Sequence, residues 1–547
     1  MMNRVYKSGP SREQLSLLPP RIEDYVDQEN PVRAIEAYAC SLDLEKLGFR
    51  NTDGGGGAGQ PSYDPADLLK LYLYGYLHQV RSSRRLERET QRNLEVMWLL
   101  RGLTPGQRTI SNFRKDNWAA LKAANREFVL LARELGLLGG ALVAIDGAFF
   151  HGDASKGSIK TQKRLNEQLA AVERDIEAYG QALEAGDAAE EAGAAGKPDG
   201  DGQEGGRQGG GGGIADKLAA LRARRSEVEA DLARLQESGE TQLSTTDADA
   251  RLVSKRGHTL AGYNVQIAVD DKHKLIVASE VVNDGNDTGQ LYAMARAAKE
   301  ALGAETLQAL ADAGYYNGAQ LKDCEDNGIV AYVPQVRRGV RLAARGRLSH
   351  EEFSYDRQAD AYRCPGGQLL KRSATLKDNG GRLEIRYVSR KAVCDACPLR
   401  ARCVETKAGT RTVCRWVHED VIERHQTRMK DPDGAALMRR RGCLVEHPFG
   451  TLKCRAGYRH FLVRGFDKVR GEWSLMALCY NFGRLLSILG IDGFKAHLAR
   501  RLAALLHILR VPTTMRSFPA ILSLASRIGF RSGKKRPTSR LYFRLAG

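Results

Sequence analysis

ALVAIDGAFFHGD, residues 141–153, is the stretch that decides the fold. It opens with a short apolar run that ends in Asp146 and is followed by Gly147. Such a run is typical of a buried strand, and Asp146 would then lie where that strand meets a sheet edge. A second stretch, TLQALADAGY at residues 306–315, repeats the pattern and ends its strand at Asp312. We therefore expect two carboxylates to converge on one edge of a sheet.

The segments around these two strands predict the rest of an α/β core. Residues 261–271 and 274–282 form a predicted β-hairpin, and a helix, a strand, a second helix and a final strand follow up to residue 335. The order strand, hairpin, helix, strand, helix, strand is that of an RNase H-like mixed sheet. We expect this core to be formed by residues 140–155, 241–340 and 430–490.

A third carboxylate comes from LVEHPFGTLKCR, residues 444–455. Pro448 is tolerated in the first turn of a helix or at a kink, so we expect Glu446 at or just before a helix start, with Lys453 two turns later. If this helix packs across the sheet, three carboxylates meet, and hard oxygen ligands suit Mg²⁺ or Mn²⁺. Stabilisation of a helix N-terminus is the alternative role for Glu446. Four other aspartates are rival ligands for which turn and capping roles are commoner: Asp247, Asp249, Asp284 and Asp287.

Residues 1–135 predict an all-α N-terminal domain that binds DNA. Apolar residues recur at helical spacing, and Asp64 with Pro65 signals a helix start. Two basic clusters in this domain are candidate phosphate contacts, although a solvated turn is the alternative for the first. The predicted DNA contacts are Arg81, Arg84, Arg85, Arg114 and Lys115.

An insertion interrupts the core at residues 156–240. Apolar residues keep a four-three spacing on both sides of a Gly-rich segment, which predicts two heptad helices joined by a disordered linker at residues 186–213. We expect an antiparallel helical hairpin with a structural role, and a DNA-binding or partner-binding arm is the alternative.

A second insertion, residues 345–415, is rich in cysteine. A CxxC pair, a third cysteine and an upstream turn suit tetrahedral Zn²⁺ in a zinc-ribbon-like unit, and free thiols are the alternative. A redox role is disfavoured because no thioredoxin-like context surrounds the CxxC pair. The predicted ligands are Cys364, Cys394, Cys397 and Cys403.

The chain as a whole is basic, with 84 Lys and Arg against 66 Asp and Glu and a formal net charge of +18. This excess favours a polyanionic partner such as nucleic acid. Residues 500–547 predict a basic C-terminal tail that adds salt-sensitive DNA affinity, unless the tail has no function. We see neither a signal segment nor an apolar run long enough to span a bilayer, so we expect a cytoplasmic protein.

The motifs IDG, ADAGYY and LVEHPFGTLK together resemble the catalytic blocks of DDE transposases of bacterial insertion sequences, in the broad IS-four/IS-five-like superfamily. Residues of the N-terminal segment resemble the InsH-like domain of these enzymes, and the family often carries a Cys-rich block before the catalytic Glu. In the family a Tyr, an Arg, the Glu and a Lys lie along the last catalytic helix. Glu446 and Lys453 fit that spacing, whereas the Arg position is Gly442, with Arg440 and Arg441 beside it and no Tyr before them.

The resemblance implies a reaction as well as a fold. Asp146, Asp312 and Glu446 would hold two Mg²⁺ or Mn²⁺ ions, with Asp146 bridging them, for cleavage and strand transfer at the element ends. It implies double-stranded DNA as partner, both the terminal inverted repeats and the target, with a homodimer in the complex and a nucleoid-associated location. Lys453, Arg440 and Arg441 would contact DNA phosphates. Two alternatives stay open: an inactive zinc-bearing DNA-binding protein, and an RNase H-like nuclease without strand transfer.

Overall fold

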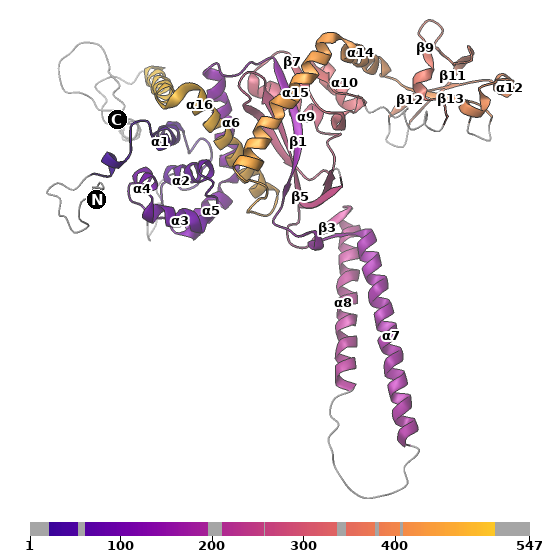
Figure 1. Cartoon of the computed structure of the whole chain (residues 1–547), viewed down its shortest axis with the longest axis horizontal. Coiled ribbons are helices and arrows are strands. Elements are labelled where there is room, and N and C mark those ends of the chain that lie inside the picture. The colour runs from indigo at the N-terminus through magenta and orange to yellow at the C-terminus, as the bar shows by residue number, and fades with distance from the viewer. Residues whose placement is uncertain are drawn as a thin grey trace, which may run out of the picture.

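A computed structural model of the chain describes residues 21–52, 61–194, 211–255, 257–335, 346–377, 382–404 and 409–508. Its centre is a six-stranded mixed sheet in the order β4-β5-β1-β7-β8, with β6 also paired to β5 (Figure 1). The strands are β1 (Leu142–His151), β4 (Arg251–Lys255), β5 (His258–Asp270), β6 (Ile276–Val282), β7 (Leu307–Leu310) and β8 (Ile329–Tyr332). β1 runs antiparallel to β5 and parallel to β7, and β7 runs parallel to β8. This is the topology of an RNase H-like core, so the predicted fold class is confirmed.

The apolar run of β1 is buried on both faces of the sheet. Val143 and Ile145 pack in one core with α9 (Leu291–Leu302) and α10 (Gly318–Asp326), whereas Leu142 and Ala144 face the other core. Alternation of side chains with period two explains why neighbours in the run serve opposite cores. A strand buried on both sides reads as a continuous apolar run, which is the signal that the sequence carries.

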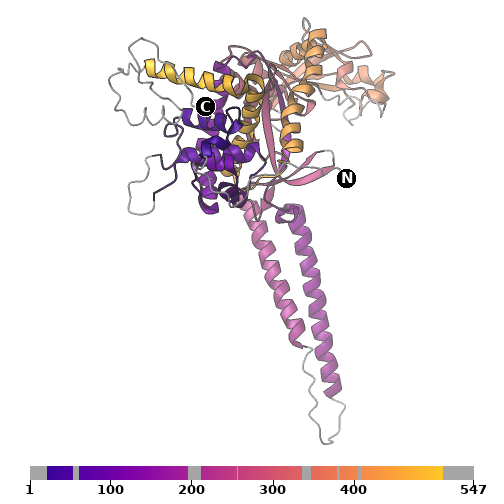
Figure 2. The ribbon, with the colours of Figure 1, turned by 60° about the vertical axis from the view of Figure 1, so that its left-hand side comes forward.

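The N-terminal helices form a separate layer that packs against α16 (Phe466–Ile508). Asp64 accepts a hydrogen bond from the Ala66 amide and caps α2, as its position before Pro65 predicts. Figure 2 shows α16 between this layer and the sheet. The helices of the layer are α1 (Pro31–Ser41), α2 (Pro65–Leu77), α3 (Ser83–Arg92), α4 (Leu94–Leu99), α5 (Gln107–Asp116) and α6 (Trp118–Glu134).

α16 is the longest helix described, and Gly490 breaks it with a positive φ of 69°. Of the described helices it alone is long and apolar enough to cross a membrane, over residues 466–501. Arg484 and Asp492 interrupt it, so it is not an unbroken apolar run. Of its most apolar window, 56% is buried inside the protein, as expected for a core helix. Residues 509–547 of the predicted basic tail lie outside the described residues.

The first insertion is a helical hairpin that projects from the body (Figure 1). It consists of α7 (Gln162–Ala194) and α8 (Gly211–Ser238), and its base is closed by the short strands β2 (Ile159–Thr161) and β3 (Gln242–Ser244). A narrow apolar core holds the two helices together. The ends of the predicted linker, 186–194 and 211–213, are helical, while residues 195–210 lie outside the described part of the chain.

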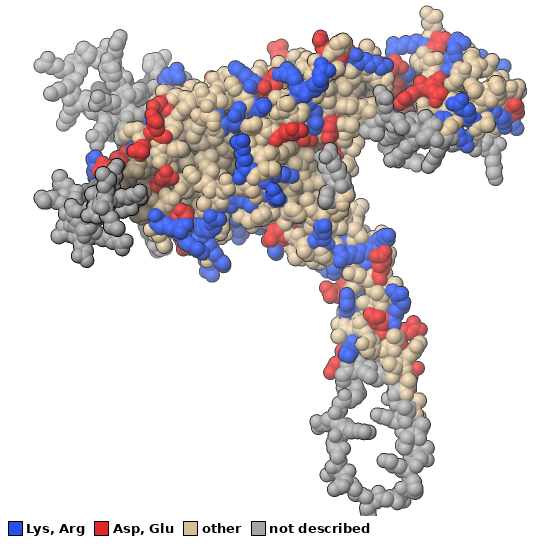
Figure 3. Space-filling model, in the orientation of Figure 1, with Lys and Arg blue, Asp and Glu red and all other residues tan. Residues whose placement is uncertain are grey.

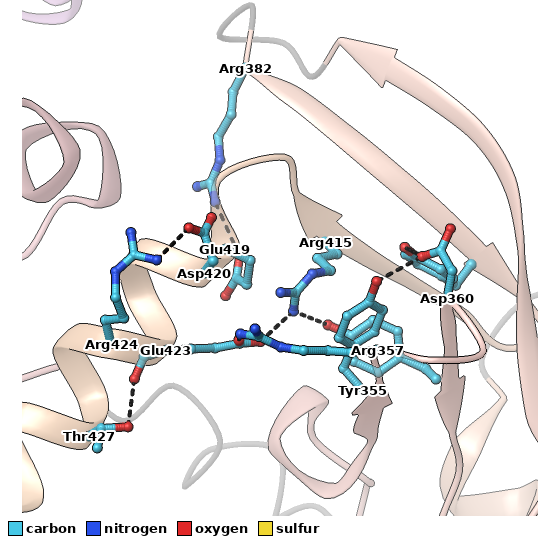
Figure 4. A network of polar contacts seen from close by, with 12 residues as sticks. Tyr355, Arg357, Asp360, Arg382, Arg415, Glu419, Asp420, Glu423, Arg424 and Thr427 are labelled. Carbon is cyan, nitrogen blue, oxygen red and sulfur yellow. Dashed lines mark hydrogen bonds and ion pairs between the residues drawn. The ribbon is translucent and has the colours of Figure 1, made fainter. Parts of the chain in front are cut away.

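The second insertion is a five-stranded antiparallel sheet in the order β13-β12-β11-β10-β9. Its elements are β9 (Ser354–Asp356), β10 (Ala361–Arg363), β11 (Leu369–Lys377), β12 (Leu383–Val388), α12 (Lys391–Asp395), α13 (Arg400–Cys403) and β13 (Thr412–Trp416). Ion pairs join this sheet to α14 (Glu419–Lys430): Glu423 pairs with Arg415 and with Arg357, each at 2.6 Å (Figure 4). On its other side Arg424 of α14 pairs with Glu325 of the core. α14 therefore fixes the insert to the RNase H-like sheet.

Candidate active site

Asp146 and Asp312 lie on neighbouring strands at the same edge of the central sheet. β1 and β7 pair in parallel up to Ala144 and Leu310, and each aspartate follows two residues later. Asp146 lies within β1, and Asp312 caps the turn after β7 by accepting a hydrogen bond from the Gly314 amide at 2.9 Å. Both side chains are partly exposed. The structure thus brings together the first two carboxylates that the sequence predicted.

The third carboxylate, Glu446, lies on α15 (Pro432–Gly450), which packs against β1. The expectation that Glu446 stands at a helix start is wrong, because α15 begins at Pro432 after the Asp431 cap and places Glu446 near its end. Pro448 lies inside the helix and is followed by a π-helical turn, Thr451–Arg455. A proline this close to a helix end removes one hydrogen bond, and the wider turn after it takes up the distortion.

Arg441, on the same helix, contacts both aspartates. Its Nη2 lies 3.0 Å from Asp146 Oδ1 and 3.7 Å from Asp312 Oδ2. Glu446 is exposed, and its carboxylate turns back toward Gly442, where an added Cβ would lie 3.5 Å from Glu446 Oε1. Two carboxylates close enough to contact the same Arg441 nitrogen can supply the oxygen ligands that Mg²⁺ and Mn²⁺ prefer.

Lys453 and Arg440 both have partners within the protein. Lys453 Nζ donates to the Phe149 carbonyl oxygen of β1 at 2.6 Å and lies 4.3 Å above the Phe150 ring. This places its ammonium beside the strand that carries Asp146. Arg440 is exposed and pairs with Asp271 at 3.0 Å.

A buried amide–carboxylate cluster lies directly behind the Asp pair. Asp287 Oδ1 accepts hydrogen bonds from Asn264 Nδ2 at 2.8 Å and from Gln266 Nε2 at 2.7 Å. Tyr315 donates to Gln266 Oε1, and burial together with the nearby carboxylates raises the pKa of Tyr315 well above its usual range. A Cβ on Gly147 would lie 2.5 Å from Gln266 Nε2 and 2.6 Å from Asp287 Oδ1. Sequence reasoning missed this cluster, since Asp287 stands among turn-forming residues and its partners are distant in sequence.

Two of the predicted DNA contacts turn out to be internal. Arg81 and Arg114 are 8% and 7% exposed and pair with the fully buried Glu472 at 3.7 and 3.5 Å. They join the N-terminal layer to α16 and expose little surface for the predicted DNA contact. The remaining members of the set, Arg84, Arg85 and Lys115, are exposed. Figure 3 shows further Lys and Arg side chains over the central body, along the course of α15.

The four predicted zinc ligands line one cavity of about 440 Å³ in the insert. The Gln368 amide donates to Cys364 Sγ at 3.3 Å, the Cys394 thiol donates to Ser389 Oγ at 2.9 Å, and burial raises the pKa of the Cys403 thiol. Basic side chains line the same cavity: Arg363, Lys371, Arg390, Arg400 and Arg411. In the described part of the chain, no group of three or more His, Cys, Asp or Glu side chains could hold a metal ion as placed.

Comparison with known proteins gives two family matches. The family described as Transposase domain (DUF772) matches residues 20–116, and the family described as Transposase DDE domain matches residues 363–486. The second match includes the four cysteines and Glu446 but neither Asp146 nor Asp312. No curated protein matches the chain.

One solved structure, described as a cryo-EM structure of piggyBac transposase synaptic complex with hairpin DNA, aligns with 94% of this chain and 87% of its own. The identity is 8% and the TM-score 0.29, a likeness too slight to support an argument. The two family matches do not depend on it. The matches to a transposase domain at residues 20–116 and to a transposase DDE domain at residues 363–486 support a DDE transposase.

Proposed function

We propose that this transposase cuts DNA at the ends of an insertion sequence and joins the freed ends to target DNA, with Asp146, Asp312 and Glu446 as its catalytic carboxylates. The observation that carries the proposal is the convergence of Asp146 and Asp312 on one edge of an RNase H-like sheet, within reach of the same guanidinium. Glu446 on α15 supports it, because this helix packs against the strand that bears Asp146.

The three carboxylates would hold divalent ions, Mg²⁺ or Mn²⁺. Two bound ions supply activation of the attacking oxygen and stabilisation of the leaving oxygen in an in-line displacement at phosphorus. The chain itself fixes Asp146 by its pairing with Ile267 of β5 and Asp312 by the turn that it caps. Rigid placement of this kind orients the ligands in advance, so no further conformational entropy is lost at the moment of reaction.

Basic side chains around this edge would hold the DNA. Lys453, held beside β1 by its hydrogen bond to the Phe149 carbonyl oxygen, would contact a phosphate of the bound DNA. Arg440, Arg441 and the exposed Arg84, Arg85 and Lys115 complete the proposed contacts. The partners would be the terminal inverted repeats and the target DNA, bound by a homodimer at the bacterial nucleoid in the cytoplasm.

We also propose a structural Zn²⁺ in the insert, held by Cys364, Cys394, Cys397 and Cys403. The support is their common cavity together with the amide donor to Cys364, since thiolate ligands are stabilised by such hydrogen bonds. Elemental analysis of the purified protein tests this proposal. One zinc per chain that is lost in Cys397→Ser supports it, and a zinc-free folded protein contradicts it.

The proposed reaction is tested with the full chain, labelled DNA that carries the flanks of its own gene, and Mg²⁺ or Mn²⁺ against EDTA. Asp146→Asn and Glu446→Gln are expected to abolish cleavage while DNA binding persists. Cleavage without joining would favour a nuclease, and binding without cleavage of correct ends would favour an inactive DNA-binding protein. Joined products that need both metal and the two carboxylates would establish a transposase mechanism.

A further inference from the structure

Arg441 stands where the proposed metal ligands converge. One nitrogen of its guanidinium is within 3.0 Å of Asp146 and 3.7 Å of Asp312, and the side chain is 16% exposed. Its Nε is buried and makes no hydrogen bond to any described residue, so the guanidinium uses only part of its donor capacity. One terminal nitrogen of the guanidinium therefore contacts both Asp146 and Asp312, and the two carboxylates share its positive charge.

Two carboxylates so close repel each other unless a cation lies between them. A guanidinium can supply that cation, and it remains charged at any pH at which proteins fold. Arg441 carries one positive charge against two negative charges, so the cluster keeps a net negative charge that attracts a divalent ion. The same oxygens cannot be fully available to the guanidinium and to a metal ion at once.

We propose that Arg441 is the resident counter-ion of Asp146 and Asp312 in the DNA-free protein, and that it must leave for a divalent ion to bind. This inference rests on the proposed function, because it takes the aspartates as metal ligands. A DNA phosphate gives the departing guanidinium a new partner, with planar donors that match phosphate oxygens and that the aspartates leave unused. Metal and DNA then bind with positive coupling, since each favours the displaced position of Arg441.

The neighbouring Arg440 provides a matched control. It also pairs with an aspartate at 3.0 Å, but that aspartate, Asp271, lies outside the cluster. Arg440→Gln and Arg441→Gln therefore remove the same charge from adjacent positions of one helix, and each breaks the contacts of an arginine with aspartate. Only Arg441→Gln breaks contacts with the proposed metal ligands.

The test is a Mn²⁺ titration of the full chain without DNA, with free Mn²⁺ followed by electron paramagnetic resonance. We expect Arg441→Gln to tighten Mn²⁺ binding about tenfold, within the range typical of coupled sites, and Arg440→Gln to leave it at the wild-type value. Arg441→Lys keeps a charge but loses the fork of donors, so we expect a smaller tightening. This second variant keeps the test decisive if the glutamine variant does not fold.

Thermal unfolding supplies an independent readout. In EDTA, Arg441→Gln should melt below the wild type, and Mn²⁺ should raise its melting temperature by more than it raises that of the wild type. Equal or weaker Mn²⁺ binding by both Arg441 variants, with binding still lost in Asp146→Asn, would overturn the counter-ion role alone. Undiminished Mn²⁺ binding by Asp146→Asn would instead contradict the metal site and with it the proposed function.

Discussion

Two of the described clusters of arginine and carboxylate side chains have opposite charge balance. At the junction of the N-terminal layer and α16, one carboxylate, Glu472, faces two guanidiniums, Arg81 and Arg114. At the sheet edge, two carboxylates face one guanidinium. Glu472 is completely buried and also accepts hydrogen bonds from Tyr76 and the Leu462 amide, whereas the sheet-edge acids are partly open to solvent.

The difference separates a structural cluster from the proposed site. Around Glu472 each charged side chain has a fixed partner of opposite charge, and burial keeps further ligands out. At the sheet edge negative charge exceeds positive charge in a place that solvent reaches. Such an excess attracts a cation. Of these two clusters, the one at the sheet edge therefore has both the excess of acid and the access to solvent that a cation site needs.

The largest effect should come from removing the acid of the buried cluster. Glu472→Gln leaves two buried guanidiniums without their counter-ion, and we expect it to lower the free energy of unfolding by about 3–5 kcal/mol. Asp312→Asn should change it by less than about 0.5 kcal/mol, because it removes repulsion and Asn can still cap the following turn. Urea unfolding of both variants in EDTA measures the contrast. Equal losses would show that the two clusters do not differ in the way described.

A buried histidine sharpens the comparison, because burial keeps it neutral. His425 of α14 is 1% exposed and accepts a hydrogen bond from the Val333 amide at 3.3 Å, and burial lowers its pKa to about 4. The unfolded chain takes up the proton near pH 6.5, so stability is complete above that pH and falls as the pH drops toward 4. The expected loss is about 3 kcal/mol. Unfolding from pH 7 to 4 should show a shallower loss in His425→Gln, and an unchanged slope would contradict this assignment.

The support behind the sheet-edge acids can be broken without touching a charge. Gly147→Ala places a methyl group within 2.6 Å of Gln266 and Asp287, and we expect a loss of about 1–3 kcal/mol together with a drop in DNA cleavage. Gly285→Ala is the control, because nothing lies within 4 Å of its added Cβ. Urea unfolding and end cleavage of the two variants are compared side by side. Wild-type stability and activity in Gly147→Ala would mean that the cluster behind the acids is not tightly packed.

The smallest effect on stability is expected where the basic side chains are exposed. Replacing Arg84, Arg85 and Lys115 by Ala should change the free energy of unfolding by less than about 0.5 kcal/mol and reduce the salt dependence of DNA binding by about one unit per lost phosphate contact. The control removes three exposed charges from the hairpin, at Lys217, Arg222 and Arg224. DNA-binding isotherms at several salt concentrations measure the salt dependence of the two variants. A larger effect from the hairpin variant would assign DNA contact to the hairpin instead.

Much of the core could be predicted from sequence because local rules govern it. The apolar run before Asp146 and the similar run before Asp312 specify buried parallel strands, and the sheet pairs them as expected. The start of α15 could not be placed in this way. The prediction took Pro448 as a first-turn residue, whereas the cap at Asp431, followed by Pro432, determines where the helix begins.

The roles of the arginines could not be predicted because they depend on distant partners. Arg81 resembles Arg84 and Arg85 in local sequence, yet it alone of the three meets Glu472, almost 400 residues further along the chain. Arg441 similarly gains its role from two acids on other elements. Basic composition indicates that the chain has many Lys and Arg side chains, and only the fold determines which of these side chains remain exposed.

The helical hairpin also affects how the chain can fold. About 100 residues separate the end of β1 from the start of β5, although these strands are neighbours in the sheet. Closing so long a loop costs about 2 kcal/mol more entropy than closing one of about ten residues. Once α7 has paired with α8 and β2 with β3, the two ends lie close together, and pairing of β1 with β5 becomes nearly local. The insertion thus offsets the kinetic barrier that its own length would otherwise impose on the catalytic sheet.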